Sequence, residues 1–496
     1  LDDGAMPAIE SAKLSRGWAR ALVAMGVLLY LGALSSKWFP CRDGAAYLLI
    51  GRNLAEGRGW VMNGTPAQWY SPGLPIFWSL VTRTWGEQYL VSSVFQVSMA
   101  LLSCLAVWLA ARRMGGERLA ALVALTLLFS HNVMRNTVVA QTDLAFLALF
   151  SWTVAGLRLC LDGKKWGLAL AAASLSAGLF FRMPGCLAAP WLALGFVLEG
   201  ARLRPAWRWG SLAVMVAAPA AVVAWYWSVR NDGGSGGYVR MASFLADLGP
   251  WDLLGRFGKS AALTPQGLLR LLLDMSLPGL LFLPCAALAA LGVLHEARAG
   301  RHMMPLVCAG HVVSMNLVMG ISGPSRRYLL PILPWMIYFT FLGLAMVAER
   351  LAARWERLTP RRVILGAAAL LILVGAARSM EDLVRIHRSE GPWVEEAHWP
   401  AVHDLCVWLR QNTAERDTVL ARESVVIAYW TRRPAIELSS QVASGPQAVV
   451  DAIEKHHPRY VAVHSEEADP AALGAALAGR YIQAAQVGPY AVFRGL

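Results

Sequence analysis

Long apolar runs recur along the chain as far as residue 379, and short polar or basic segments separate them. A transmembrane helix needs about 20 mostly apolar residues. This length predicts eleven spans, of which the third and the sixth are short. The predicted spans lie near residues 17–36, 88–111, 117–132, 142–160, 166–182, 186–200, 209–229, 267–294, 303–321, 327–348 and 362–379.

The composition favours the same class of protein. The 496 residues are 56% hydrophobic and 16% charged, whereas soluble domains carry about 25% charged residues. The formal net charge of +13 fits Lys and Arg in cytoplasmic loops better than a nucleic-acid partner, so we expect no nucleic acid. The seven Cys show no CxxC and no Cys/His metal spacing, which argues against a disulfide framework and a zinc site.

Basic residues in the short loops predict the orientation. Loops rich in Lys and Arg stay in the cytoplasm. With the N-terminus in the cytoplasm, all six inner segments are basic: the N-terminus, 112–118, 161–165, 201–208, 295–302 and 349–361. The outer side then receives a large first loop, 37–87, and everything after about residue 380.

The tail has a different pattern. Short strand-like runs, such as "RYVAVHS" and "YAVFRGL", alternate with helical segments such as "PQAVVDAIEKHH". This alternation predicts a small α/β domain. We therefore expect a transmembrane domain over 1–379 and an external domain over 380–496. Its Glu423, His456, His457 and His464 are interpreted as surface or packing residues.

Ionisable residues at the predicted outer ends of spans are candidates for function, because such groups are costly in or beside a membrane. Each also has a structural interpretation. Asp43 and Asp143 could be helix N-caps. Arg182 and the Arg326–Arg327 pair could be anchors that extend to the interface. Asp274, inside an apolar run, is interpreted as structural. That two acids and three arginines share one predicted face favours chemistry on a lipid phosphate, with a carboxylate as general base.

Several motifs, in order, resemble those of bacterial integral-membrane glycosyltransferases with the GT-C fold, in the branch that includes protein O-mannosyltransferases and the lipid A aminoarabinose transferase. The resembling segments are "RDGAAYLLIGRNLAEGRGW", "YSPGLPIFWSLVTRTWG", "QTDLAFLALF", "FFRMPG" and "RRYLLPILP". The resemblance implies a polytopic α-helical GT-C protein in the bacterial inner membrane, with about eleven helices. Its active site would lie on the periplasmic side.

The resemblance also implies the reaction and the residues. One sugar would move from a polyprenyl-phosphate donor to a lipid, glycan or protein acceptor by inverting displacement. Asp43 would be the base, and Asp143 would help to build the site or bind a divalent cation, the one candidate cofactor. The donor phosphate would be held by Arg182, Arg326, Arg327 and Tyr328, and Tyr47 and Tyr70 would bind substrate.

A transporter or lipid flippase is the alternative. It predicts inverted repeats and charges near the middle of the membrane. The sequence shows no internal repeat, and the candidate charges lie at one predicted face. The sequence does not identify the sugar, the acceptor or a metal.

Overall fold

A computed structural model gives the fold. It describes residues 15–67, 70–230, 247–273, 282–319, 326–355, 357, 359–394, 399–438 and 446–496. Contacts within the chain divide it into two compact units. Unit 1 covers 15–34, 93–138 and 142–384 among these residues. Unit 2 covers 35–92, 139–141 and the described residues from 385 to 496.

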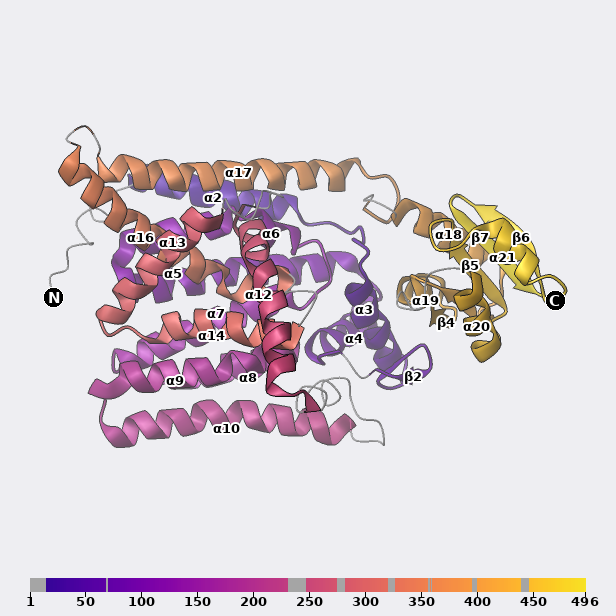
Figure 1. Ribbon diagram of the computed structural model, residues 1–496, viewed down its shortest axis with the longest axis horizontal. Coiled ribbons are helices and arrows are strands. Elements are labelled where there is room, and N and C mark those ends of the chain that lie inside the picture. Colours follow the sequence, from indigo (N-terminus) through magenta and orange to yellow (C-terminus); the bar gives the residue numbers. More distant parts are fainter. Residues whose placement is uncertain are drawn as a thin grey trace. The chain divides into compact units, whose positions relative to one another are not determined.

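Unit 1 is built of helices that run side by side (Figure 1). Its α-helices are α2 (Arg16–Gly32), α5 (Tyr89–Leu128), α6 (His131–Arg135), α7 (Asp143–Leu161), α8 (Trp166–Phe181), α9 (Ala189–Glu199), α10 (Pro205–Arg230), α12 (Pro250–Leu273), α13 (Phe282–Arg298), α14 (Met303–Met319), α15 (Arg326–Leu329), α16 (Leu333–Arg354) and α17 (Pro360–Arg388). Three short 3-10 helices join them: η1 (Met183–Leu187), η2 (Gly200–Arg202) and η5 (Leu330–Ile332). Five of the described helices are long and apolar enough to cross a membrane, and four more are apolar but shorter.

Helix α5 consists of two arms joined at a kink. Gly115 and Gly116 leave the helical conformation, and Gly116 has a φ of 81°, which favours glycine. The kink falls between the spans predicted at 88–111 and 117–132. The two arms therefore match the residue ranges of the second and third predicted spans, whose crossing of the membrane stays a prediction.

The eighth predicted span, 267–294, does not match one described helix. Residues 250–273 form α12, which the sequence had placed largely in a loop, and α13 begins at Phe282. Residues 274–281, including Asp274, lie outside the described part of the chain. In Figure 1, α12 runs across the direction of the other helices. Its residues are apolar on one face and charged at Asp252, Arg256 and Lys259, so no uniform apolar run marked this helix.

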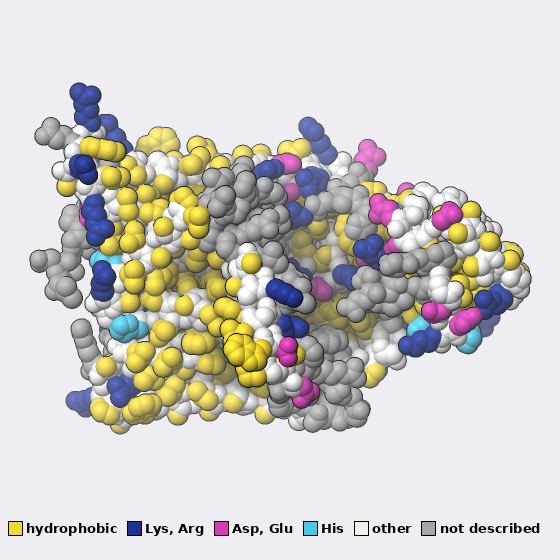
Figure 2. Space-filling model, in the orientation of Figure 1, with side chains coloured by type: hydrophobic (Ala, Val, Ile, Leu, Met, Phe, Trp, Pro, Cys, Tyr) yellow, Lys and Arg dark blue, Asp and Glu magenta, His cyan; other side chains and the backbone are white. Residues whose placement is uncertain are grey.

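The visible surface of unit 1 is mostly hydrophobic, with basic side chains gathered at one end. Figure 2 shows hydrophobic side chains over much of its visible face, and Lys and Arg gather at the end where α9 leads into α10 and α16 into α17. These loops belong to the basic segments that the sequence assigns to the cytoplasm. The side of the membrane itself stays a prediction.

Helices α7 and α8 pack closely because glycines face each other. A Cβ at Gly156 of α7 would lie 2.7 Å from the backbone of Gly167 and Ala171, and one at Gly167 would lie 2.5 Å from the Gly156 carbonyl oxygen. Small residues allow such close approach between membrane helices. This contact fixes α7, which begins at Asp143, against α8, which ends directly before Arg182.

Unit 2 contains a five-stranded mixed sheet of order β4-β3-β5-β7-β6. Its strands are β3 (Val419–Ala421), β4 (Ala435–Glu437), β5 (Tyr460–His464), β6 (Tyr481–Val487) and β7 (Tyr490–Gly495), and its helices are α18 (Trp399–Asn412), α19 (Ser424–Thr431), α20 (Pro446–His456) and α21 (Pro470–Ala476). Strand β3 is parallel to β4 and β5, whereas β7 is antiparallel to β5 and β6. The predicted α/β tail is confirmed in its class, although β4 and β6 were not predicted.

The first loop belongs to the same unit as the tail. It forms α3 (Arg42–Ala55), α4 (Gly73–Trp85) and a two-stranded hairpin of β1 (Val61–Met62) and β2 (Thr65–Pro66). One apolar core joins side chains from both segments, including Trp38 and Trp78 from the loop and Leu405, Val426 and Tyr429 from the tail. The tail therefore supports the helix that carries Asp43.

Candidate functional site

Asp143 lies at the centre of a buried charge cluster in unit 1. Its Oδ1 is 2.7 Å from the Nη1 of Arg182, and its Oδ2 is 3.1 Å from the Nη2 of Arg327. The Nε of Arg327 also donates a hydrogen bond to Oδ2, at 3.2 Å. Asp143 is 2% exposed and Arg182 6%. One carboxylate between two guanidinium groups leaves an excess positive charge, which suits an anion.

Each arginine is held by a break between helices. Arg182 has an extended backbone between α8 and η1, with φ −148° and ψ 93°. Gly185 lets η1 pack on α7, because a Cβ there would lie 2.3 Å from the ring of Phe146. Arg327 belongs to the single turn α15. Pro-Gly and Pro-rich sequence after each arginine ends the regular helix and turns the cation inward.

Tyr328 completes the cluster. The guanidinium carbon of Arg182 lies 4.7 Å from the centroid of the Tyr328 ring, within the range of a cation–π contact. Arg182 also reaches the hydroxyl of Thr142, at 3.4 Å. The carbonyl of Tyr328 accepts a hydrogen bond from the Nε2 of His311, at 2.7 Å. The structure thus brings together Asp143, Arg182, Arg327 and Tyr328, while the side chain of Arg326 lies outside the described part.

Two structural interpretations from the sequence are wrong here. Thr142, not Asp143, is the N-cap of α7. Arg182 is buried against Asp143 and is therefore not an anchor that extends from a helix end to the interface.

Asp43, in unit 2, is not a cap either. The N-cap of α3 is Cys41, whose Sγ accepts a hydrogen bond from the Gly44 amide at 3.2 Å. The side chain of Gln141 donates to the same sulfur, at 3.2 Å. Asp43 stands in the first turn, partly exposed, where the helix dipole favours a negative charge.

Two tyrosines accompany Asp43. Tyr47 is one turn further along α3, and its ring meets that of Tyr70 edge to face, with centroids 5.2 Å apart. Burial, and then the negative charge of Asp43, raise the pKa of Tyr70. The Tyr70 phenol therefore stays protonated at neutral pH and can donate a hydrogen bond.

Arg52, the residue that fixes α3, was not predicted from the sequence. This side chain is 4% exposed, and its Nη2 lies 2.8 Å from Oε2 of Glu87. Its Nη1 donates to the Tyr429 carbonyl at 2.5 Å, and its guanidinium carbon lies 4.2 Å from the centroid of the Tyr429 ring. Arg52 thus ties α3 to both α19 and the start of α5.

Replacing Arg52 by Met is expected to lower the melting temperature of the purified protein. The change leaves Glu87 and the Tyr429 carbonyl without their buried partner, which costs about 3 kcal/mol. Arg58→Met is the matched control, because Arg58 pairs with Glu56 at an exposed site where ion pairs contribute about 1 kcal/mol or less. Equal melting temperatures for the two variants would contradict the proposal that the contacts of Arg52 stabilise α3.

Other buried ionic contacts in unit 1 were also missed. His131 Nε2 lies 2.7 Å from Asp382 Oδ2, which connects α6 to α17. At the opposite end of α7 from Asp143, Arg158 pairs with Glu199, and Glu296 pairs with Arg301 at 2.7 Å. Their partners come from different helices or from across a loop, so sequence spacing could not reveal them.

The residues do not fit a divalent cation at Asp143. Both carboxylate oxygens already face guanidinium groups. Among the residues that the structure describes, no three His, Cys, Asp or Glu side chains gather as metal ligands.

Comparison with known proteins identifies the fold. No protein-family model and no curated protein sequence matches the chain. Among solved structures, ArnT from Cupriavidus metallidurans bound to undecaprenyl phosphate matches with a TM-score of 0.63 and 15% identity, over 97% of this chain and 99% of that one. The archaeal oligosaccharyltransferase AglB from Archaeoglobus fulgidus, in complex with an inhibitory peptide and a dolichol-phosphate, matches with a TM-score of 0.58 and 13% identity, over 90% and 69% of the two chains.

The arabinofuranosyltransferase AftD from Mycobacteria matches with a TM-score of 0.50 and 12% identity, over 97% of this chain and 42% of that one. The chain therefore has the GT-C fold of membrane glycosyltransferases and is a multi-pass integral membrane protein. The predicted fold class is confirmed, whereas the count of eleven spans stays a prediction.

Proposed function

We propose that this chain transfers a sugar from a polyprenyl-phosphate donor to an acceptor hydroxyl or amine. The observation that carries the proposal is the Asp143–Arg182–Arg327 cluster, in which one buried carboxylate faces a buried and a half-buried guanidinium group, so that positive charge is in excess among the described side chains. It occurs in a fold whose solved examples include proteins with bound undecaprenyl phosphate and dolichol-phosphate. Arginines that face a developing phosphate charge lower the barrier for its departure.

In the proposed reaction the donor phosphate is held by Arg182 and Arg327, with Tyr328 beside them. The acceptor oxygen or nitrogen forms a bond to the anomeric carbon as the bond from that carbon to the phosphate oxygen breaks. Polyprenyl phosphate leaves with the electron pair, and Asp43 takes the acceptor's proton. Asp143 holds the two arginines together against their mutual repulsion and orients them toward the phosphate. Tyr47 and Tyr70 contact substrate beside Asp43.

Asp43 suits the base because its carboxylate is partly exposed and caps no helix. Asp143 is less suited to the role of general base, because two guanidinium groups already pair with its carboxylate oxygens.

Release of polyprenyl phosphate tests the function. Purified protein would be incubated with a polyprenyl-phosphate sugar and a membrane extract as a source of acceptors. Sugar incorporation and stoichiometric polyprenyl phosphate are expected. A transporter or flippase would instead move the intact donor between leaflets of a vesicle without cleaving it. Movement without cleavage by the folded protein, over a panel of donor sugars, would reject the transferase.

The proposed location of the site on the periplasmic side has its own test. A reporter that is active only in the periplasm, fused after Leu496, is expected to be active. The physical reason is that six basic segments keep the opposite loops in the cytoplasm. An inactive reporter, with a cytoplasmic reporter active at the same position, would place the tail inside.

A further inference from the structure

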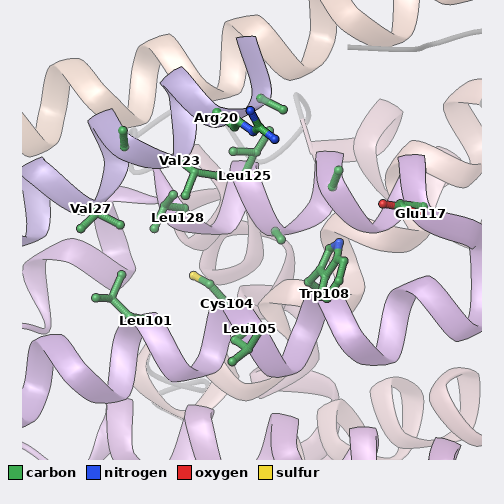
Figure 3. A pocket seen from close by; sticks show the side chains of 14 residues that line it. Arg20, Val23, Val27, Leu101, Cys104, Leu105, Trp108, Glu117, Leu125 and Leu128 are labelled. Carbon is green, nitrogen blue, oxygen red and sulfur yellow. The ribbon is translucent and has the colours of Figure 1, made fainter. Parts of the chain in front are cut away.

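Unit 1 contains a cavity of about 670 Å³ between α2 and the two arms of α5. Its walls are apolar along most of their length, with Val27, Leu101, Leu105 and Leu125 among them. Figure 3 shows Val27, Leu101 and Leu128 toward one end and Trp108 and Glu117 toward the other. The cavity is therefore an elongated apolar slot between three helices.

Packing of α2 closes one end of this slot. A Cβ at Gly26 would lie 2.3 Å from the side chain of Leu128, so α2 touches the second arm of α5 there. Beyond this contact, Arg20 and Val23 of α2 line the cavity on one side, and α5 lines it on the other. Apolar side chains at its edge are exposed, including Val23 at 47% and Leu105 at 45%. In a membrane protein such side chains face acyl chains.

The other end carries charge. Arg20 and Glu117 both line the cavity. Arg112 lies 3.7 Å from the carboxylate of Glu117, and its guanidinium carbon is 5.2 Å from the centroid of the Trp108 ring. Two cations and one acid leave this end positive, which complements an anionic head group and opposes a cationic one.

This charged end is distant from the Asp143 cluster. Arg113, beside the α5 kink, pairs with Asp162, which directly follows α7. Asp143 begins that 19-residue helix, and a rise of 1.5 Å per residue separates the two ends by about 28 Å. One phosphate cannot occupy both places, so a lipid in the slot is not the donor bound at Arg182.

We propose that the slot binds an acyl chain of an anionic glycerophospholipid whose phosphate lies against Arg20 and Arg112. Basic pockets between transmembrane helices bind anionic lipid head groups in this way. The acyl chain lies against the apolar walls, and the guanidinium groups form charge-assisted hydrogen bonds to the phosphate. The proposal is independent of the proposed transfer reaction.

Native mass spectrometry of the purified full-length protein in detergent tests it. Phosphatidylglycerol and phosphatidylcholine with the same acyl chains would be titrated separately. The parent is expected to bind one phosphatidylglycerol more tightly than phosphatidylcholine. Arg20→Gln should weaken phosphatidylglycerol binding about fivefold, because a basic residue near the surface contributes about 1 kcal/mol.

Two further variants separate the slot from general surface charge. Arg298→Gln removes an exposed arginine from the last turn of α13 and should leave the affinity unchanged. Ala124→Phe places a ring in the slot and should abolish the tight binding. Three results would each overturn the proposal. They are equal affinity for both lipids, equal effects of Arg20→Gln and Arg298→Gln, and displacement of phosphatidylglycerol by polyprenyl phosphate. A protein dimer that Ala124→Phe dissociates would also overturn it, since a second copy would then fill the slot.

Discussion

An Asp43→Asn variant is expected to transfer sugar about 10²–10⁴ times more slowly than the parent, because the amide cannot accept the acceptor's proton. The structural cost should be small. Cys41 caps α3, so the cap remains, and losing the interaction of the Asp43 charge with the helix dipole costs about 0.3–1 kcal/mol. A fall of several orders of magnitude in rate, with a melting temperature near that of the parent, is therefore the expected pair of results.

The measurement is the initial rate of polyprenyl phosphate release at saturating donor, together with thermal unfolding in the same detergent. Glu56→Gln provides a control, since it makes the same carboxylate-to-amide change at the other end of α3, where Glu56 pairs with Arg58. A folded Asp43→Asn protein with a rate within a few-fold of the parent's would remove Asp43 from the role of base. Asp143 would then be the next carboxylate to test.

Arg182→Gln is expected to lower kcat/KM for the donor about 10²–10³-fold, the typical loss when one preorganised donor to a developing anion is removed. The variant should still fold, because Asp143 keeps its second partner, Arg327. The excess positive charge of the cluster disappears, so polyprenyl phosphate should also become a weaker inhibitor.

Asp143→Asn gives the opposite change in charge at the same place. It leaves both guanidinium groups and removes the carboxylate between them, so inhibition by polyprenyl phosphate should not weaken. Turnover should fall, because the two arginines then repel each other and are no longer held in place beside the phosphate. If Arg182→Gln and Asp143→Asn weaken inhibition by polyprenyl phosphate to the same extent, the cluster acts only in folding. Arg182 would then not bind the donor phosphate.

Much of the cluster could be predicted from the sequence. The basic loops oriented the spans, and that orientation placed Asp143, Arg182 and Arg327 on the same predicted outer face. The predicted helix after Asp43 is also confirmed, as α3, and Gly57, which follows it, has a φ of 78°. Local patterns were sufficient for these features, because hydrophobic length and helix-ending residues act over a few turns.

The remaining features depend on distant partners. Arg52 sits in an ordinary amphipathic stretch, and only the folded chain shows that Glu87 and Tyr429 surround it. Helix α12 was missed because its charged face interrupts the apolar run by which spans are recognised. The pairing of Asp143 with both arginines also required side-chain geometry.

The shared core of the first loop and the tail affects how the protein is made. The hydroxyls of Tyr89 and Tyr429 lie 2.9 Å apart, yet 340 residues separate them in the chain. At a synthesis rate of 5–20 residues per second, the loop leaves the ribosome about 17–70 s before this partner exists. During that interval Trp38, Trp78 and their neighbours lack half of their core. Biogenesis should therefore depend on factors that shield an incomplete domain, and a chain that stops before residue 399 should be degraded rather than accumulate as a membrane bundle.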